Sequence, residues 1–170
     1  MHTPSTITAD SFGGLLDIAR PRVAALGNAI EVVCGPISTG GQGSIERNLR
    51  AFGAVIDALL GHGRVVFDQR PYEHAIFALR TRWREADPAR KDAYCTPILE
   101  EFYRPLYEGY PITVAWFLPG WESSRGTCWE HALLRAKGTD IRYLDPEWTL
   151  AAFEGFSVEK PVYRTKIEPG

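Results

Sequence analysis

The chain has 170 residues, of which 45% are hydrophobic and 24% are charged, and its formal net charge at pH 7 is −2. This length suits one domain with a full hydrophobic core, and the near-neutral charge gives no reason to expect binding to a nucleic-acid polymer or an anionic membrane. No run of residues approaches the length of a membrane span and no signal peptide is evident, so we expect a cytoplasmic protein without membrane contact.

The cysteines and histidines show neither a disulfide pattern nor a metal-ligand pattern. They are scattered along the chain without a CxxC pair, at Cys34, Cys95 and Cys128 and at His2, His62, His74 and His131. A disulfide framework or a zinc site is therefore not expected, and we predict no metal and no cofactor. Cys128 falls in the first turn of a predicted helix, where a thiolate could be stabilised, but a small semi-buried thiol explains it better.

The first part of the chain alternates between strand and helix patterns. Residues 12–26 predict a short helix that is broken at Pro21. The run AIEVVCG, residues 29–35, is β-branched and closed by glycine, which predicts a buried strand. Apolar residues at helical spacing predict a helix over residues 45–60, and RVVFD, residues 64–68, predicts a second strand. Strand, glycine loop, helix and strand in this order are typical of a parallel sheet.

The second part continues the alternation. Helices are predicted over residues 72–84 and 96–109, the latter capped by Thr96 and kinked by Pro105. The run ITVAWFL, residues 112–118, is apolar throughout, as a central parallel strand should be. The remaining elements are a helix from about Gly126, a strand at 141–144, a helix at 146–154, and an edge strand or tail at 161–167. The sum is an α/β fold with four to five mainly parallel strands and helices on both faces.

The predicted α/β domain covers residues 29–156, after an N-terminal extension at 1–28 and before a C-terminal tail at 157–170. Two loops follow strands at the carboxyl edge of its sheet, where such sheets bind ligands. The first, GPISTGGQGS at residues 35–44, has four glycines that let the backbone approach a ligand. It matches neither the Rossmann fingerprint nor a P-loop, and a plain connector explains it equally well.

The second loop, PGWESSRGT at residues 119–127, leads into a helix. Ser123, Ser124, Gly126 and Thr127 can offer hydroxyls and backbone N–H groups at the helix N-terminus, which could bind a phosphate. Ordinary N-capping explains serine and threonine there better.

Glu130 lies one turn further into this helix, among mostly apolar neighbours. It could be exposed and pair with Arg135, or it could point into a cleft as a nucleophile or general base. Near phosphate-binding hydroxyls it would be placed to attack a sugar carbon of a bound nucleotide. His131 points about 100° away from it on a helix and is interpreted as a packing or surface residue.

Other residues offer weaker indications. Trp121 could stack on a nucleobase, although tryptophans around a cleft also serve core packing. Three arginines could meet a phosphate, or could be solvated: Arg47, Arg50 and Arg125.

Taken together, VVCGPIS after the first strand and S-x-G-T-x-x-E-H-A-L-L-R-A-K-G after the central strand resemble the nucleoside 2-deoxyribosyltransferase superfamily. This superfamily includes deoxynucleoside 5′-monophosphate N-glycosidases and cytidine monophosphate hydrolases. The resemblance covers roughly residues 30–144. It implies a flavodoxin-like doubly wound fold, a homodimer or higher homo-oligomer whose active site is completed at a subunit interface, and a small-molecule nucleotide or nucleoside as partner.

The resemblance also implies roles for particular residues. Glu130 would be the catalytic glutamate, which attacks the anomeric carbon to form a glycosyl-enzyme that water or an incoming base resolves. Ser124 would hold the 5′-phosphate or 5′-hydroxyl. The first loop would line the base and phosphate side through Gly35, Ile37, Ser38 and Gly41.

The chain departs from the superfamily pattern in its second acid. Many members carry an aspartate before the phosphate-side loop or on the helix before the central strand. Here the loop region offers only Glu122, and the preceding helix offers Glu100 and Glu101. We take Glu101 as a sugar or base contact; the alternative is a solvent-facing glutamate pair beside Arg104.

The leading hypothesis is a hydrolase that cleaves the N-glycosidic bond of a nucleoside 5′-monophosphate, releasing free base and sugar phosphate. The alternatives are a 2-deoxyribosyltransferase that exchanges bases and a non-catalytic nucleotide-binding module. A domain that binds flavin mononucleotide is a further alternative, although Glu130 would then put a negative charge beside the cofactor phosphate. Fold alone does not decide among them.

Overall fold

The computed structural model describes residues 5–37 and 41–167. They belong to two compact units, the first made of residues 1–27 and 68–110 and the second of residues 28–67 and 111–170. This division follows contacts between residues rather than chain order. The limits of 29–156 for an α/β domain stay a prediction.

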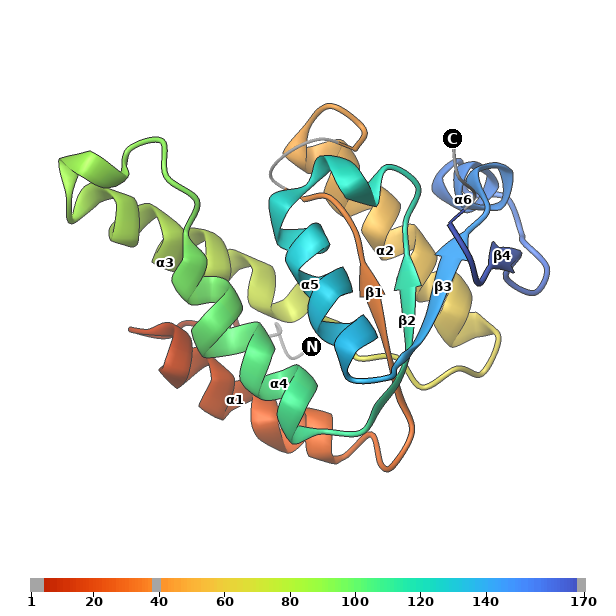
Figure 1. Cartoon of the computed structure of the whole chain (residues 1–170), viewed down its shortest axis with the longest axis horizontal. Helices are drawn as coiled ribbons and strands as arrows, with labels where there is room; N and C mark the ends of the chain where they lie inside the picture. Colours follow the sequence, from red (N-terminus) through yellow and green to blue (C-terminus); the bar gives the residue numbers. More distant parts are fainter. Residues whose placement is uncertain (1–4, 38–40, 168–170) are drawn as a thin grey trace. The chain divides into compact units, whose positions relative to one another are not determined.

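The second unit is an open four-stranded sheet with helices on both faces (Figure 1). The strand order is β1 (Ile30–Cys34), β2 (Ile112–Phe117), β3 (Asp140–Leu144) and β4 (Tyr163–Arg164). The first three strands are parallel and β4 is antiparallel to β3. The predicted mainly parallel α/β sheet is therefore confirmed. The segment at 161–167, for which an edge strand or a tail was predicted, contributes a two-residue edge strand.

Residues 64–68 do not form the predicted second strand. Within the described residues this segment makes a single parallel bridge, from Val66 to Glu31 on the open side of β1. Two backbone hydrogen bonds accompany it, from Glu31 N–H to the Val65 carbonyl at 2.8 Å and from Phe67 N–H to the Glu31 carbonyl at 2.9 Å. The Asp68 carboxylate then accepts the Arg70 N–H at 3.0 Å, which starts a 3₁₀ turn and ends the extended stretch.

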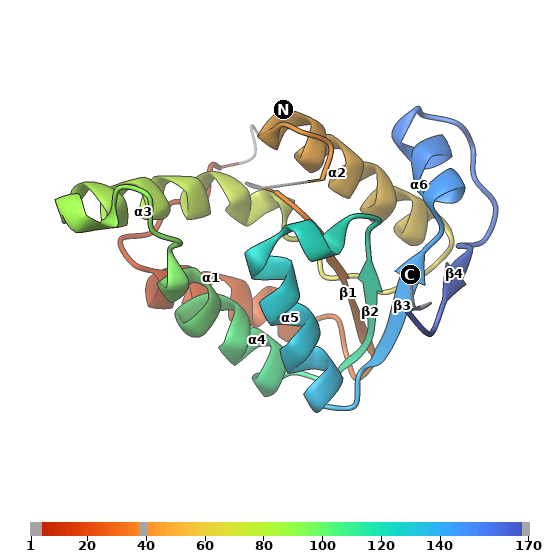
Figure 2. The same cartoon turned by 45° about the horizontal axis from the view of Figure 1, so that its top comes forward.

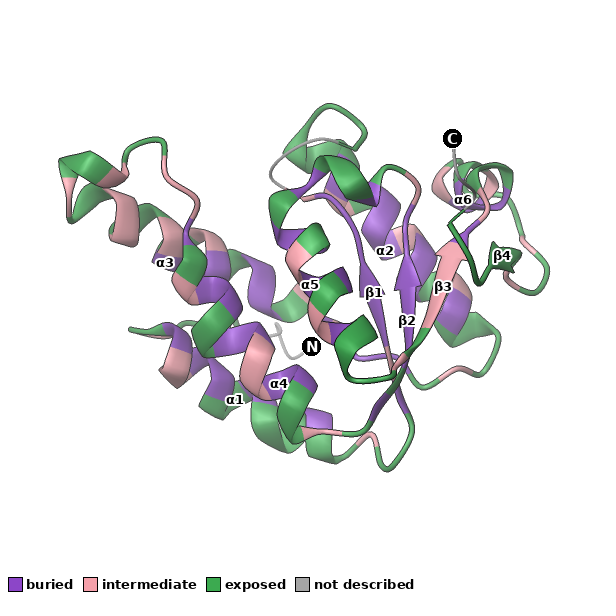
Figure 3. Cartoon of the chain, in the orientation of Figure 1, coloured by how far each residue is buried: buried purple, intermediate pink, exposed green. Residues whose placement is uncertain are grey.

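Helices cover both faces of this sheet. α5 (Arg125–Ala136) lies on one face, and α2 (Ile45–Gly61) and α6 (Pro146–Phe153) lie on the other (Figures 1 and 2). Four of the apolar residues predicted at helical spacing on α2 are buried in the core: Phe52, Val55, Ile56 and Leu59. Leu49 is half-buried and Leu60 is 42% exposed. β1 and β2 are almost wholly buried (Figure 3). This core comprises Val33, Ala51, Phe52, Val55, Ile56, Leu59, Val66, Val114, Trp116, Leu118, Leu144 and Trp148.

The first unit is helical. Its longer elements are α1 (Phe12–Ala24), α3 (Glu73–Glu85), the π-helix η3 (Ile98–Tyr103) and α4 (Arg104–Gly109). Short 3₁₀ turns precede and follow α3, at Arg70–Tyr72 and Pro88–Arg90. α1 packs on η3, α4 and α3, and the rings of four buried aromatic residues meet in the unit: Tyr72, Phe102, Tyr103 and Tyr107.

Two sequence predictions about this unit are wrong in detail, and a third is made more specific. Pro21 does not break α1, which continues to Ala24, because buried residues such as Val23 hold the last turn in place. Thr96 already lies within the helical turn, so it is not the cap. At Pro105 the helical segment is not shortened, and its irregularity is a π-helix that precedes the proline. Proline has no N–H, so an α-helical hydrogen bond from residue 105 to the Glu101 carbonyl cannot form. The segment before Pro105 adopts the wider π-helical turn instead.

Candidate functional site

The loops after β1 and β2 lie against each other at the carboxyl edge of the sheet. Leu118 N–H donates to the Cys34 carbonyl at 2.9 Å, and a Cβ on Gly35 would lie 2.8 Å from Leu118 Cδ1. From β1 the chain crosses to Val66 on one side and later returns to β2 on the other. Strand order thus reverses between β1 and β2, and ligands bind at such switch points in open α/β sheets. The structure therefore brings the two predicted loops together.

Asn48 of α2 holds the glycine loop in place, and the sequence analysis did not single it out. Its Oδ1 accepts the Gln42 N–H at 2.6 Å, and its Nδ2 donates to the Ile37 carbonyl at 2.9 Å. Gly41 has a φ of +64°, and a Cβ there would lie 2.6 Å from Asn48 Oδ1. One signal was present, because an asparagine four residues before Phe52 shares the apolar face of the predicted helix and must find partners when buried.

Ser123 and Ser124 both have contacts within the protein. Ser123 Oγ accepts the Gly41 N–H at 3.1 Å and donates to the Gly120 carbonyl at 2.6 Å, so it joins the two loops. Ser124 caps α5 by accepting the Thr127 N–H at 3.4 Å, as the capping interpretation predicts. A hydroxyl that accepts keeps its hydrogen for donation, so Ser124 can cap the helix and also donate to an anion. The phosphate contact itself stays a prediction.

Glu130 lies on the buried face of α5 and is 8% exposed. Gly126, Thr127 and Leu134 are also buried and share this face at helical spacing. The interpretation of Glu130 as a solvent-exposed carboxylate is therefore wrong. Side chains on a helix lean toward its N-terminus, so Glu130 leans toward the turn capped by Ser124, which begins about 9 Å away along the helix axis.

His131, which follows Glu130 on α5, packs in an aromatic cluster with Trp121 and Tyr143. Its ring stacks on Trp121 with centroids 4.2 Å apart, and its Nε2 lies 2.7 Å from the Tyr143 hydroxyl oxygen. Burial lowers the pKa of His131, and the positive charge of Arg135 lowers that pKa further. This agrees with the interpretation of His131 as a packing residue, and it means that one face of Trp121 is covered.

A pocket of about 280 Å³ opens at the carboxyl ends of β2 and β3. Its charged groups are two acids and two bases: Glu122, Asp145, Arg164 and Lys166. Trp121 and Tyr143 contribute to its wall, but Glu130 is not among its lining residues. This pocket therefore adjoins the second predicted loop without containing the predicted nucleophile.

The other predicted site residues divide between the two units. Ile37 is half-buried with its carbonyl bound by Asn48, and Ser38 lies outside the described residues. Glu101 belongs to the first unit, where it is exposed on η3. Arg104 pairs there with Glu100 at 2.7 Å and with Glu108 at 3.1 Å. The exposure of Glu101 agrees with the alternative of a solvent-facing glutamate.

Two further features concern metals and membranes. Across residues 5–37 and 41–167, no group of three or more His, Cys, Asp or Glu side chains is arranged to hold a metal ion. In that same part of the chain, no helix combines the length and the apolar character needed to cross a membrane.

No family model matches the chain, and no curated protein or solved structure matches it. The resemblance to the nucleoside 2-deoxyribosyltransferase superfamily therefore rests on the two sequence motifs, and the argument for function rests on the site.

Proposed function

We propose that the chain is a hydrolase that cleaves the N-glycosidic bond of a nucleoside 5′-monophosphate and releases free base and sugar phosphate. The observation that carries this proposal is the burial of the Glu130 carboxylate on the face of α5 that runs back to the carboxyl edge of the sheet. A carboxylate shielded from bulk solvent is suited to a reaction from which bulk water is excluded.

The surrounding fold supports a phosphate-bearing substrate. The order Val66, β1, β2, β3 is compatible with a flavodoxin-like fold, whose ligand site lies at the switch point. At that edge α5 begins with a serine cap, and N–H groups of a first helical turn find no acceptor within their own helix. Together with the helix dipole, these groups favour an anion, and the Ser124 hydroxyl could add a donor.

In the proposed reaction a Glu130 carboxylate oxygen forms a bond to the anomeric carbon. The bond between that carbon and the base nitrogen breaks, and its electron pair leaves with the base, which takes up a proton from water. A water molecule then attacks the anomeric carbon, loses a proton and releases Glu130 as a carboxylate. Two successive displacements give retention at the anomeric carbon, as in retaining glycosidases.

The test is release of free base from a panel of nucleoside 5′-monophosphates, followed by chromatography. Glu130→Gln keeps the side-chain shape and should lower the rate at least about a thousandfold, because an amide is not a nucleophile. The matched control is Glu85→Gln, at an exposed glutamate of α3 outside both loops, which should leave the rate near that of the wild type. If Glu130→Gln releases base at the wild-type rate, Glu130 is not the nucleophile.

Additional measurements separate the alternatives. Formation of a new nucleoside when a second free base is added would favour base exchange over hydrolysis. Nucleotide binding without release by the wild type would favour a non-catalytic module. Equal release from nucleosides and from their monophosphates would contradict phosphate recognition at the α5 N-terminus.

A further inference from the structure

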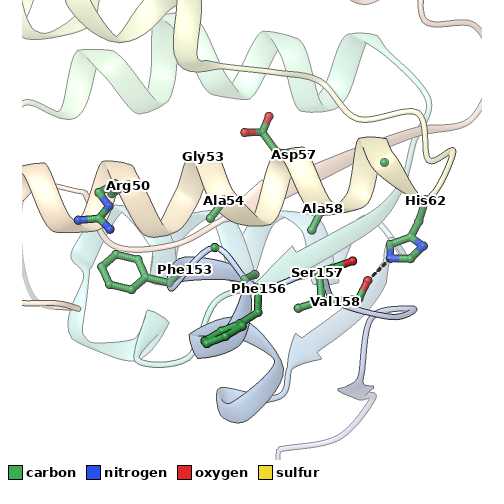
Figure 4. Close-up of a pocket in the computed structure, with 13 residues that line it drawn as sticks. Arg50, Gly53, Ala54, Asp57, Ala58, His62, Phe153, Phe156, Ser157 and Val158 are labelled. Carbon is green, nitrogen blue, oxygen red and sulfur yellow. Dashed lines mark hydrogen bonds between the residues drawn. The ribbon is translucent and has the colours of Figure 1, made fainter.

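The second unit has another hollow, between α2 and the segment from α6 to Val158 (Figure 4). It lies on the face of the sheet opposite α5. Its volume is about 650 Å³, within the usual size of small-molecule sites. The residues that line it are Arg50, Gly53, Ala54, Asp57, Ala58, Gly61, His62, Ala152, Phe153, Gly155, Phe156, Ser157 and Val158.

The hollow exists because α2 presents small residues to it and because α6 ends in a tight turn. Gly155 has a φ of +84°, and the Phe156 N–H donates to the Ala151 carbonyl at 3.0 Å. This left-handed turn ends α6 and directs the chain back along α2. Figure 4 shows Phe156 and Ser157 on the far side of the hollow from Ala54 and Ala58.

Arg50 supplies positive charge at one end of the hollow. Its guanidinium carbon lies 4.8 Å from the centre of the Phe153 ring, and Figure 4 shows the two side chains together. A guanidinium that stacks on a ring keeps its in-plane N–H groups available for a carboxylate, sulfonate or phosphate. The acid in the lining, Asp57, lies seven positions along α2, roughly 10 Å away along the helix axis. The Arg50 end is therefore suited to an anion.

The lining of the hollow also includes an exposed aromatic ring. Phe156 is 65% exposed, and an exposed phenyl ring gains free energy when a flat apolar group covers it. The opposite end is closed by His62, whose Nε2 lies 3.0 Å from the Val158 carbonyl oxygen. Because a carbonyl only accepts, His62 Nε2 carries the hydrogen and donates.

We propose that this hollow binds a small planar aromatic anion, with its ring on Phe156 and its anionic group on Arg50. The site shares no residue with the loops at the carboxyl edge and does not depend on the proposed function. A negative result for this binding site therefore does not bear on the proposed hydrolase activity, and a negative result for that activity does not bear on this site.

Titration of the full chain with 2-naphthoate, followed by isothermal calorimetry, tests this proposal. Saturable binding at one site is expected. The neutral 2-naphthamide should bind about tenfold more weakly because it lacks the charge, and cyclohexanecarboxylate should bind at least as weakly because it lacks the flat ring. No saturation with 2-naphthoate, or equal binding of the neutral amide, would overturn the proposal.

Variants locate the site. Arg50→Gln and Phe156→Ala change exposed side chains and should each weaken 2-naphthoate binding about tenfold, and Ala54→Leu should abolish it by filling the hollow. The matched controls are Arg135→Gln on α5 and Leu150→Ala on α6, which do not line the hollow and should bind as the wild type does. Thermal unfolding checks that each variant folds. Equal weakening in the controls and in the exposed-residue variants would place the binding elsewhere.

Discussion

The Gly41 N–H donates a hydrogen bond to the Ser123 hydroxyl oxygen over 3.1 Å, although the two residues lie 82 positions apart in the chain. Ser123 in turn donates to the Gly120 carbonyl, so one hydroxyl ties the loop after β1 to the loop after β2. A hydrogen bond of this kind holds the two loops in a fixed position relative to each other.

We expect Ser123→Ala to release the glycine loop. The variant loses two hydrogen bonds at an exposed position, so the free energy of unfolding should fall by about 1 kcal/mol. Amide hydrogen exchange at Gly41 should become faster, because its acceptor is gone. Ser157→Ala, at another exposed serine, serves as the control in urea denaturation and hydrogen exchange. Unchanged exchange at Gly41 would show that the bond does not order the loop.

Gly41 and Gly43 form a matched pair for a second prediction. Both have positive φ, +64° and +89°, so alanine at either position strains the backbone by about 1 kcal/mol. They differ in space: a Cβ on Gly41 would lie 2.6 Å from Asn48 Oδ1 and 2.8 Å from Pro36 Cβ, whereas a Cβ on Gly43 meets nothing within 4 Å.

Gly41→Ala should therefore lower the free energy of unfolding by about 1–3 kcal/mol more than Gly43→Ala, as overpacking does elsewhere. Urea denaturation of both variants measures the difference. Equal losses would mean that the loop moves away from α2 without cost.

Asn48 supports a third prediction, because one buried amide satisfies two backbone groups. It is 3% exposed and bonds both the Gln42 N–H and the Ile37 carbonyl. Asn48→Ala leaves these groups without that partner and should lower the free energy of unfolding by about 2–3 kcal/mol. Asn28→Ala, at an exposed asparagine, should change the free energy little. A small effect at Asn48 would indicate that water replaces the amide.

The predictable part of this fold follows from local patterns. β1, α2, β2 and α5 were predictable because each has a run of apolar residues at strand or helix spacing, bounded by glycine, by proline or by a capping serine. The 64–68 segment has the same composition as a strand, but a strand also needs a partner along its whole length. Here Asp68 turns the chain after one bridge, and that turn depends on Arg70 rather than on the apolar run.

The position of the candidate site could be predicted, but the contacts that hold it together could not. The two loops could be located because each follows a strand at the same edge of a parallel sheet. The role of Ser123 could not be predicted, because a bond between loops 82 positions apart has no local signature. The hollow beside Arg50 was also beyond prediction, since it depends on the spacing of two helices and not on a motif.

Glu73, at the start of α3, gives the last prediction, on the pH dependence of stability. It is 9% exposed, and Gln69 Nε2 donates to its Oε1 at 3.1 Å. Burial raises the pKa of Glu73 from 4.5 to about 7, against the opposing effects of the Gln69 bond and the Arg80 charge. The folded state thus binds the proton more tightly than the unfolded chain does.

Stability from protonated Glu73 is therefore complete below about pH 4.5 and is lost as the pH rises through about 7. Glu73→Gln stays neutral and keeps an acceptor for Gln69. We expect the variant and the wild type to have similar unfolding free energies at pH 4. At pH 8 the variant should be more stable by an amount on the order of 3 kcal/mol.

Urea denaturation at intervals between pH 4 and pH 8 gives the comparison. Glu85→Gln, at an exposed glutamate on the same helix, is the control and should follow the wild-type curve. If Glu73→Gln also runs parallel to the wild type, Glu73 takes up no extra proton on folding. In that case its carboxylate is stabilised in the charged form by groups such as Arg80 to a degree that offsets its burial.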